Sequence, residues 1–211
     1  MDLVLIRHAR PAVDDGVCYG RLDLPLAEPM SPPAEAILSA AASAASANGV
    51  PPPARIVCSP ARRASVSAQR IALARVAQAG ETAPAIDSDA RLQELDFGAW
   101  EGQCWDAVPR AELDRWAADL MDARPHGGES ARTACARVVE WADAIARPAS
   151  VPCLWMVGHA GPIRMLAAHW LGLPLSVTLD WQLGWGASCG FRLDPGGARP
   201  GRLLWWNRTA G

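Results

Sequence analysis

The pattern of apolar positions along the chain predicts strands that are covered on both faces. Residues 3–6, 55–58 and 151–157 are apolar at nearly every position instead of at alternate positions. Continuous runs of this length are typical of central strands in a parallel sheet. A further short run at 84–87 indicates another strand. Near the C-terminus, the segments GFRL and GRLLWW flank a turn rich in Pro and Gly, which predicts a hairpin at a sheet edge.

Helical segments alternate with these strands. Residues 34–47 are almost all Ala, a strong helix former, and Asn48-Gly49 follows as an end signal. Ser59-Pro60 has the order of an N-cap and a first helical residue, so we expect a helix from there to about residue 79. Between this helix and the next, residues 91–102 form a loop with two glycines. The other expected helices cover 110–121, 129–147 and the segment from Pro162 to about residue 171.

The alternation of strands and helices predicts an α/β fold. We expect a three-layer α/β/α sandwich with a mostly parallel central sheet and an antiparallel edge strand. The 211 residues contain no internal repeat and no long linker, so one domain covering 1–211 is expected.

Composition excludes several classes of protein. The formal net charge of −2 gives no indication of a nucleic-acid partner. The chain has no lysine, which excludes Schiff-base enzymes and P-loop proteins. No stretch approaches the ~20 apolar residues of a membrane span, and the first apolar run is too short for a signal peptide. The six cysteines form no CxxC pair and suit buried positions in a reducing compartment. We therefore expect a cytoplasmic protein without a membrane partner.

Polar residues of related kinds follow three of the predicted strands. Arg7-His8, Ser59 and His159 stand at these ends. Ligands of open α/β sheets bind beyond the carboxyl ends of the strands, so the three ends should converge on one pocket. Helix N-termini attract anions, and arginine binds phosphate through two parallel hydrogen bonds. Arginine beside histidine disfavours a bound cation, and no HxH or HExxH spacing occurs. The set predicts a phosphoryl-binding pocket without a metal or other cofactor.

Each of these residues also has a purely structural interpretation. A single histidine at a strand end is more often a hydrogen-bonded structural residue, and it is the pair that favours chemistry. Arg62 and Arg63 lie about 100° apart on a helix, so only one can face the pocket. Glu94, Asp96 and Glu101 are the acids of the glycine-containing loop, and most acids in such loops are surface charges.

Four motifs in this order resemble the histidine phosphatase superfamily, the phosphoglycerate-mutase-like proteins. They are LIRHA at 5–9, SPARRA at 59–64, LQELDFGAWEG at 92–102 and VGHAGPIR at 157–164. A lone RH dipeptide would indicate nothing, but the set of four is specific. The first motif departs from the family's usual RHG, because Ala9 replaces the glycine.

The resemblance implies a role for each site residue. His8 would be the nucleophile that accepts the phosphoryl group on a ring nitrogen. Arg7, Arg63 and His159 would bind its equatorial oxygens, and Arg63 is preferred to Arg62 because the family's arginine stands directly before the alanine at 64. Glu94 would protonate the leaving group and then activate the water that cleaves the phosphohistidine. Such an enzyme hydrolyses a small phosphorylated metabolite and needs no metal.

The segment YGRLDLPL at 19–26 resembles the α-ribazole phosphatase branch, as does HGGESA at 126–131. Arg21 would contact substrate at the pocket rim. Alternatively, Arg21 forms an ion pair with Asp23 or Asp14 that holds the loop. Glu129-Ser130 is expected to cap or open a helix. The alternatives that stay open are a broad-specificity phosphatase, a phosphoglycerate-mutase-type enzyme and a phospho-ligand binding module without catalysis.

The ten tryptophans have two interpretations. One or two could stack on an aromatic substrate such as a benzimidazole. The alternative, which we favour, is that most of them fill the core or an interface. Trp205 and Trp206 on the predicted edge strand are candidates for a homodimer contact.

Overall fold

A six-stranded sheet forms the centre of the molecule in the computed structural model, which describes residues 1–80, 82–146, 151–194 and 201–210. The strand order is β3-β2-β4-β1-β5-β6. The first four strands run parallel, β5 is antiparallel to β1, and β6 is antiparallel to β5. The strands are β1 (Asp2–Arg7), β2 (Arg55–Cys58), β3 (Ala85–Ser88), β4 (Cys153–Gly158), β5 (Ser188–Leu193) and β6 (Gly201–Arg208). The predicted fold is confirmed, and the predicted tail hairpin supplies the antiparallel edge.

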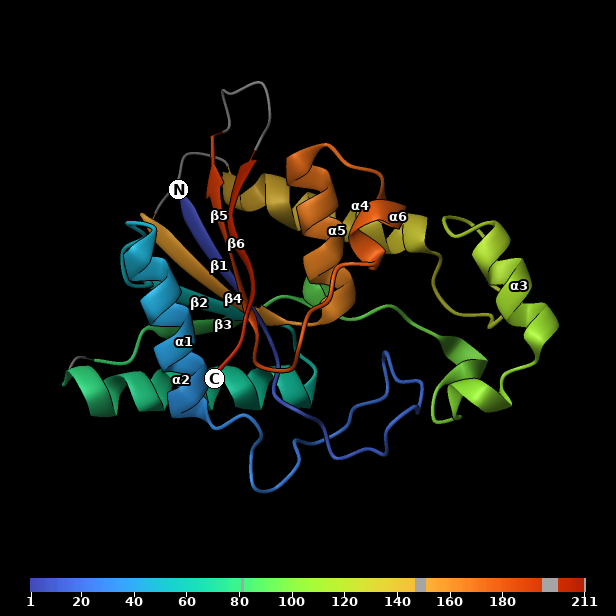
Figure 1. Cartoon of the computed structure of the whole chain (residues 1–211), viewed down its shortest axis with the longest axis horizontal. Coiled ribbons are helices and arrows are strands. Elements are labelled where there is room, and N and C mark those ends of the chain that lie inside the picture. Colours follow the sequence, from blue (N-terminus) through green and yellow to red (C-terminus); the bar gives the residue numbers. More distant parts are fainter. Residues whose placement is uncertain (81, 147–150, 195–200, 211) are drawn as a thin grey trace.

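Helices cover both faces of this sheet, and they complete the three layers visible in Figure 1. On one face lie α1 (Ala34–Ala47) and α2 (Arg62–Ala79), and on the other lie α4 (Ala131–Ala146), α5 (Ala160–Leu171) and α6 (Leu175–Leu179). Helix α3 (Arg110–Ala118) lies apart from the sheet, at the right of that view. No helix within the described part of the chain combines the length and hydropathy that a membrane span needs.

The continuous apolar runs are explained by cores on both sides of the sheet. Leu3 and Leu5 of β1 pack with the core under α4 and α5, while Val4 and Ile6 pack with the core under α1 and α2. All four side chains are completely buried. A central strand cannot alternate apolar and polar residues when both of its faces are covered.

Helix starts differ from the prediction because tertiary contacts set them. Helix α2 begins at Arg62 instead of Pro60, where the Asp23 carboxylate accepts a hydrogen bond from the Arg62 N–H at 2.7 Å. Helix α5 begins at Ala160, two residues before Pro162. Helix α4 begins after Ser130, whose hydroxyl accepts the Thr133 N–H at 3.1 Å, so the expected cap is Ser130 alone.

The remaining differences concern short elements and the end of α3, which stops at Ala118 and not at 121. The sequence pattern did not predict α6, and the loop at 91–102 contains parts of two 3₁₀ turns, η1 (Ala90–Leu92) and η2 (Gly98–Trp100). A third turn, η3 (Trp105–Ala107), follows it. Residues 195–200 of the predicted Pro/Gly-rich turn lie outside the described residues.

Candidate functional site

The carboxyl ends of the three central strands bring two histidines together. Arg7 pairs with Gly158 in the β1–β4 register, so His8 and His159 leave neighbouring strands at the same level. Their ring centroids are 5.1 Å apart at an interplanar angle of 67°. The exposed fraction is 2% for His8 and 0% for His159. The predicted convergence of these strand ends is therefore what the structure contains.

The tautomer of His8 leaves one ring nitrogen free for chemistry. Nδ1 lies 2.6 Å from the carbonyl oxygen of Ala9. A carbonyl oxygen can only accept, so Nδ1 carries the proton and Nε2 keeps its lone pair. Burial lowers the pKa of His8 well below its usual value, and the charges of Arg63 and Arg7 lower it further. His8 therefore has the protonation state of a nucleophile.

His159 is held through one nitrogen and offers the other. Its Nε2 lies 2.8 Å from the hydroxyl oxygen of Ser59, the residue that follows β2. Burial, followed by the proximity of His8 and Arg63, lowers the pKa of His159 well below its usual value. Its Nδ1 is buried and has no hydrogen-bond partner among the described residues. Such an atom is expected to meet a ligand.

Residues of the loop that precedes β5 hold the Arg7 side chain in place. Its Nη1 donates to the carbonyl oxygen of Leu183 at 2.6 Å. The guanidinium carbon lies 5.4 Å from the centre of the Trp185 ring, and that of Arg10 lies 5.1 Å from the same ring. Trp185 thus orients Arg7 by a cation–π contact.

Arg63 is fixed from the side of the segment around residue 20. Its two terminal nitrogens donate to the carbonyl oxygens of Gly20 at 2.7 Å and Leu22 at 2.8 Å. The Tyr19 ring lies 5.2 Å from its guanidinium carbon. Arg63 is completely buried, whereas Arg62 is exposed, so of the two neighbours it is Arg63 that lies inside the protein.

Arg7, Arg63 and His159 share one property. Each has a buried nitrogen without a hydrogen-bond partner in the described residues: Nε in both arginines and Nδ1 in His159. Unpaired buried polar groups are costly and call for an explanation. An anion beside His8 would satisfy them and would neutralise the charges of the buried Arg63 and the half-buried Arg7.

Glu94 lies at the N-terminus of α5, beside His159. Its Oε2 accepts the N–H of Gly161 at 3.2 Å, and its Oε1 accepts the N–H of Leu95 at 3.0 Å. The Glu94 charge also acts on Arg63. The predicted acid is thus brought to the histidine pair, although it comes from a loop with little regular structure.

Gly161 allows this placement, which leads to a prediction. A Cβ at Gly161 would lie 2.2 Å from Oε1 of Glu94, so alanine must displace the carboxylate. We expect Gly161→Ala to fold normally but to lose ~10²-fold in kcat/KM for an alkyl phosphate, the lower range for a lost acid–base group. Steady-state kinetics alongside a melting curve measure both. Unchanged kinetics would show that the position of Glu94 is unimportant.

The buried histidines also predict a pH dependence of stability. For His8 and His159 the pKa is lowered in the folded state, so between that value and the unfolded value near 6.5 the unfolded chain binds more protons. Stability should therefore fall as the pH decreases below about 6.5, by at most about 1.4 kcal/mol per pH unit for each histidine. Urea unfolding across this range measures the slope. His159→Gln should flatten it and His169→Gln, a half-exposed control, should not; the same slope in His159→Gln would contradict the prediction.

Arg21 lines a narrow cleft next to Glu94. The cleft has a volume of about 270 Å³ and is lined by Gly20, Arg21, Asp23, Pro60, Ala61, Gln93 and Glu94. Arg21 contacts neither Asp23 nor Asp14, the two partners weighed from the sequence. It donates to the Gln93 side chain and lies 3.7 Å from the Glu129 carboxylate. Asp23 instead binds the start of α2.

Two residues that shape the site were missed or misjudged at the sequence level. The sequence groups Glu101 with the surface acids of the loop, but its Oε1 accepts the backbone N–H groups of Arg21 at 2.8 Å and Phe97 at 3.0 Å. Arg137, on α4, was not singled out at all. The only sequence signal for Glu101 was its place at the end of the third motif, and Arg137 had none.

Four of the ten tryptophans are buried, and most of the others are half-buried and pack against a hydrophobic core. Trp100 is buried and donates to Glu112 at 2.8 Å, and it forms an aromatic cluster with Phe97, Trp105 and Trp116. Trp141, Trp155 and Trp170 are also buried. These positions agree with the core interpretation, and Trp185 beside Arg7 is the one that touches the site. Among residues 1–80, 82–146, 151–194 and 201–210, no three His, Cys, Asp or Glu side chains are grouped as metal ligands.

Comparison with known proteins gives a consistent result. A family model described as histidine phosphatase superfamily (branch 1) matches residues 3–208. An α-ribazole phosphatase from Shigella flexneri has a TM-score of 0.80 at 20% identity, with 100% of this chain and 98% of that chain covered. A mycobacterial glucosyl-3-phosphoglycerate phosphatase in complex with VO3 has a TM-score of 0.74 at 27% identity, with 99% of each chain covered. A protein described as mycobacterial hydrolase 1 has a TM-score of 0.76 at 26% identity, again with 99% of each chain covered. No curated protein sequence matches the chain.

Proposed function

Because the chain belongs to the histidine phosphatase superfamily and is a phosphatase, we propose that it hydrolyses small phosphomonoesters through a phosphohistidine on His8, without a metal. The observation that carries the proposal is the free Nε2 of His8 beside three unpartnered nitrogens on Arg7, Arg63 and His159. A phosphoryl group at this point would meet a nucleophile and three donors at once. Positioning and charge neutralisation are the main requirements of phosphoryl transfer.

In the first step, Nε2 of His8 attacks phosphorus and the bond to the leaving oxygen breaks. The electron pair of that bond goes to the leaving oxygen, which takes a proton from the Glu94 carboxylic acid. Arg7, Arg63 and His159 bind the equatorial oxygens, where charge is concentrated. The products are the alcohol, a phosphohistidine and the Glu94 carboxylate.

In the second step, water attacks phosphorus while the Glu94 carboxylate accepts its proton. The N–P bond breaks, its electron pair returns to Nε2 of His8, and inorganic phosphate leaves. Glu94 is then protonated again, so the cycle is complete. One side chain serves as acid and then as base, which splits a difficult hydrolysis into two easier steps.

For the substrate we propose α-ribazole 5′-phosphate, on the strength of the YGRLDLPL and HGGESA segments. Glucosyl-3-phosphoglycerate is the second candidate, and a specific observation favours it. Among the described residues, no aromatic ring lines the cleft beside Glu94, whose lining includes the polar residues Arg21, Asp23, Gln93 and Glu94. Such a lining suits a polyhydroxylated or carboxylated substrate better than a benzimidazole. The relative named for this activity is also the more similar in sequence.

The function is tested with the wild-type protein in excess EDTA. We expect hydrolysis of p-nitrophenyl phosphate to persist after chelation, whereas its loss would indicate a metal hydrolase. Tight binding of inorganic phosphate without turnover would instead indicate a binding module. The two candidate substrates and 3-phosphoglycerate are then compared by kcat/KM. Efficient isomerisation of 3-phosphoglycerate would replace the phosphatase assignment by a mutase.

A further inference from the structure

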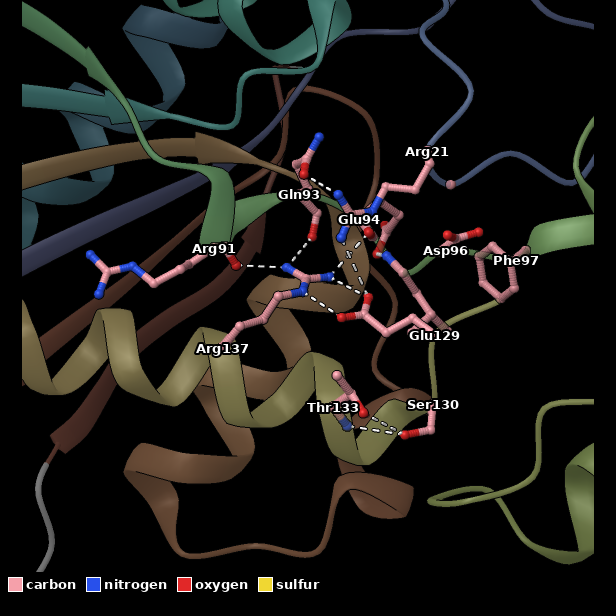
Figure 2. A network of polar contacts seen from close by, with 12 residues as sticks. Arg21, Arg91, Gln93, Glu94, Asp96, Phe97, Glu129, Ser130, Thr133 and Arg137 are labelled. Atoms are coloured by element: carbon pink, nitrogen blue, oxygen red, sulfur yellow. Dashed lines mark hydrogen bonds and ion pairs between the residues drawn. The ribbon is translucent and has the colours of Figure 1, made fainter. Parts of the chain in front are cut away.

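One guanidinium binds three backbone carbonyl oxygens at the start of the loop that carries Glu94, together with the carboxylate that faces it. After η1 the segment from Gln93 to Asp96 belongs to no helix or strand. Arg137, on α4, donates to the carbonyl oxygens of Arg91 at 2.6 Å, Gln93 at 2.6 Å and Glu94 at 3.1 Å. Figure 2 shows the Arg137 side chain pointing from α4 to this loop.

The Glu129 carboxylate fixes the orientation of the Arg137 guanidinium. Glu129 accepts two further hydrogen bonds from Arg137, both of 2.8 Å, so all five N–H donors of Arg137 are used. The side chains of Arg137 and Glu129 are only 15% and 11% exposed. A two-pronged pair of this kind fixes orientation as well as distance. The Glu129 backbone adds another tie, because its N–H donates to the carbonyl oxygen of Asp96 at 2.9 Å.

The Arg137–Glu129 pair also contacts Arg21, a residue of the cleft. Glu129 lies 3.7 Å from Arg21, and Arg21 donates to the Gln93 side chain. Arg21 and Glu94 both line the cleft described above. Arg137 and Glu129 therefore contact both the backbone of the loop that carries Glu94 and the side chain of Arg21. Neither Arg137 nor Glu129 is among the residues that line the cleft.

Stability alone is a weak explanation for this arrangement. A buried ion pair often contributes little net free energy of folding, because desolvation offsets its attraction. Its geometric effect is larger, since a misplacement of about 1 Å can cost ~10²-fold in rate. Three of the five donors bind the carbonyl oxygens of Arg91, Gln93 and Glu94, which fixes the backbone at Glu94 and just before it.

We propose that Arg137, locked by Glu129, is a positioning residue that holds Glu94 where it can protonate the leaving oxygen. The inference rests on the proposed function. It predicts that loss of Arg137 impairs leaving-group protonation specifically. Transfer of the phosphoryl group to His8 should be retained when the leaving group needs no proton.

The test compares two substrates by kcat/KM, which reports events up to the release of the first product. p-Nitrophenolate leaves without protonation, whereas glycerol 2-phosphate releases an alkoxide that requires it. Arg137→Lys should lose roughly 10- to 100-fold on glycerol 2-phosphate and less than about 3-fold on p-nitrophenyl phosphate. Glu94→Gln should show the same selectivity with a larger loss.

Arg132→Lys is the matched control. It changes the same residue type on the same helix, and Arg132 also forms a two-pronged pair, with Asp122, that does not involve the loop. We expect its kinetics to be unchanged on both substrates. A melting curve for each variant checks the fold. If Arg137→Lys does not fold, Glu129→Gln carries the same comparison.

The outcomes separate this inference from the proposed function. An equal loss on both substrates, or no loss, in a folded Arg137→Lys protein would overturn the positioning role while the phosphatase remains active. A wild-type protein that hydrolyses neither substrate would refute the proposed function and the inference together. Selective loss in Arg137→Lys, with the control unaffected, supports the inference.

Discussion

Replacement of His8 by alanine should reduce the hydrolysis of phosphomonoesters by ~10⁴-fold or more, because the covalent route requires the ring nitrogen. The free Nε2 of His8 is the reacting nitrogen in the proposed cycle. His159 binds Ser59 through its own Nε2 and stands one strand away. Initial rates with p-nitrophenyl phosphate measure the loss over several orders of magnitude.

A second histidine variant separates chemistry from folding. His169 is partly exposed and lies 3.7 Å from Asp143, so His169→Ala makes the same change away from the site. It should retain wild-type rates. If His8→Ala retained more than about a tenth of the activity with its fold intact, another residue would have to be the nucleophile.

Replacement of Arg63 by methionine has the next largest expected effect. Methionine keeps much of the side-chain volume but removes the charge, the unpaired Nε and the hydrogen bonds to the carbonyl oxygens of Gly20 and Leu22. Arginines that neutralise transferring phosphoryl groups are worth ~10³–10⁵-fold in rate. We therefore expect kcat/KM to fall by ~10³-fold or more. The Kd of inorganic phosphate should rise in parallel, which calorimetry measures independently of turnover.

Arg62→Met is the control for this prediction. Arg62 is the neighbouring residue on the same helix, and it is exposed. Its variant should behave like the wild type in rate and in phosphate binding. Comparable losses in the two variants would mean that a general positive field, and not the contact made by Arg63, is responsible.

Most of the fold could be predicted from the sequence, because the signals that indicate its strands and helices are local. Residues 3–6 and 151–157 are continuous apolar runs, and a strand with cores on both faces has no other possible pattern. The helix at 34–47 was predicted at its observed bounds from its alanine content and its Asn48-Gly49 end. The start of α2 was misplaced by two residues, because the group that caps it, Asp23, is far away in the chain.

The site was predictable only in part, for a similar reason. His8, Ser59 and His159 follow strands, so the rule for parallel sheets placed them together. Glu94 and Arg63 required the family motifs. Arg137 was beyond either argument, since a helix residue that binds backbone carbonyls of a distant loop leaves no mark on its own local sequence.

The central claim is that His8 carries the phosphoryl group during turnover, and a phosphoenzyme trap tests it most directly. Glu94→Gln should accumulate the intermediate with p-nitrophenyl phosphate, because the first step needs no proton from Glu94 and the second needs its base. We predict an alkali-stable, acid-labile phosphoryl group on the tryptic peptide that contains His8, located by mass spectrometry. A phosphoryl group on another residue, or turnover of the wild-type protein with no trapped intermediate in either protein, would contradict the account.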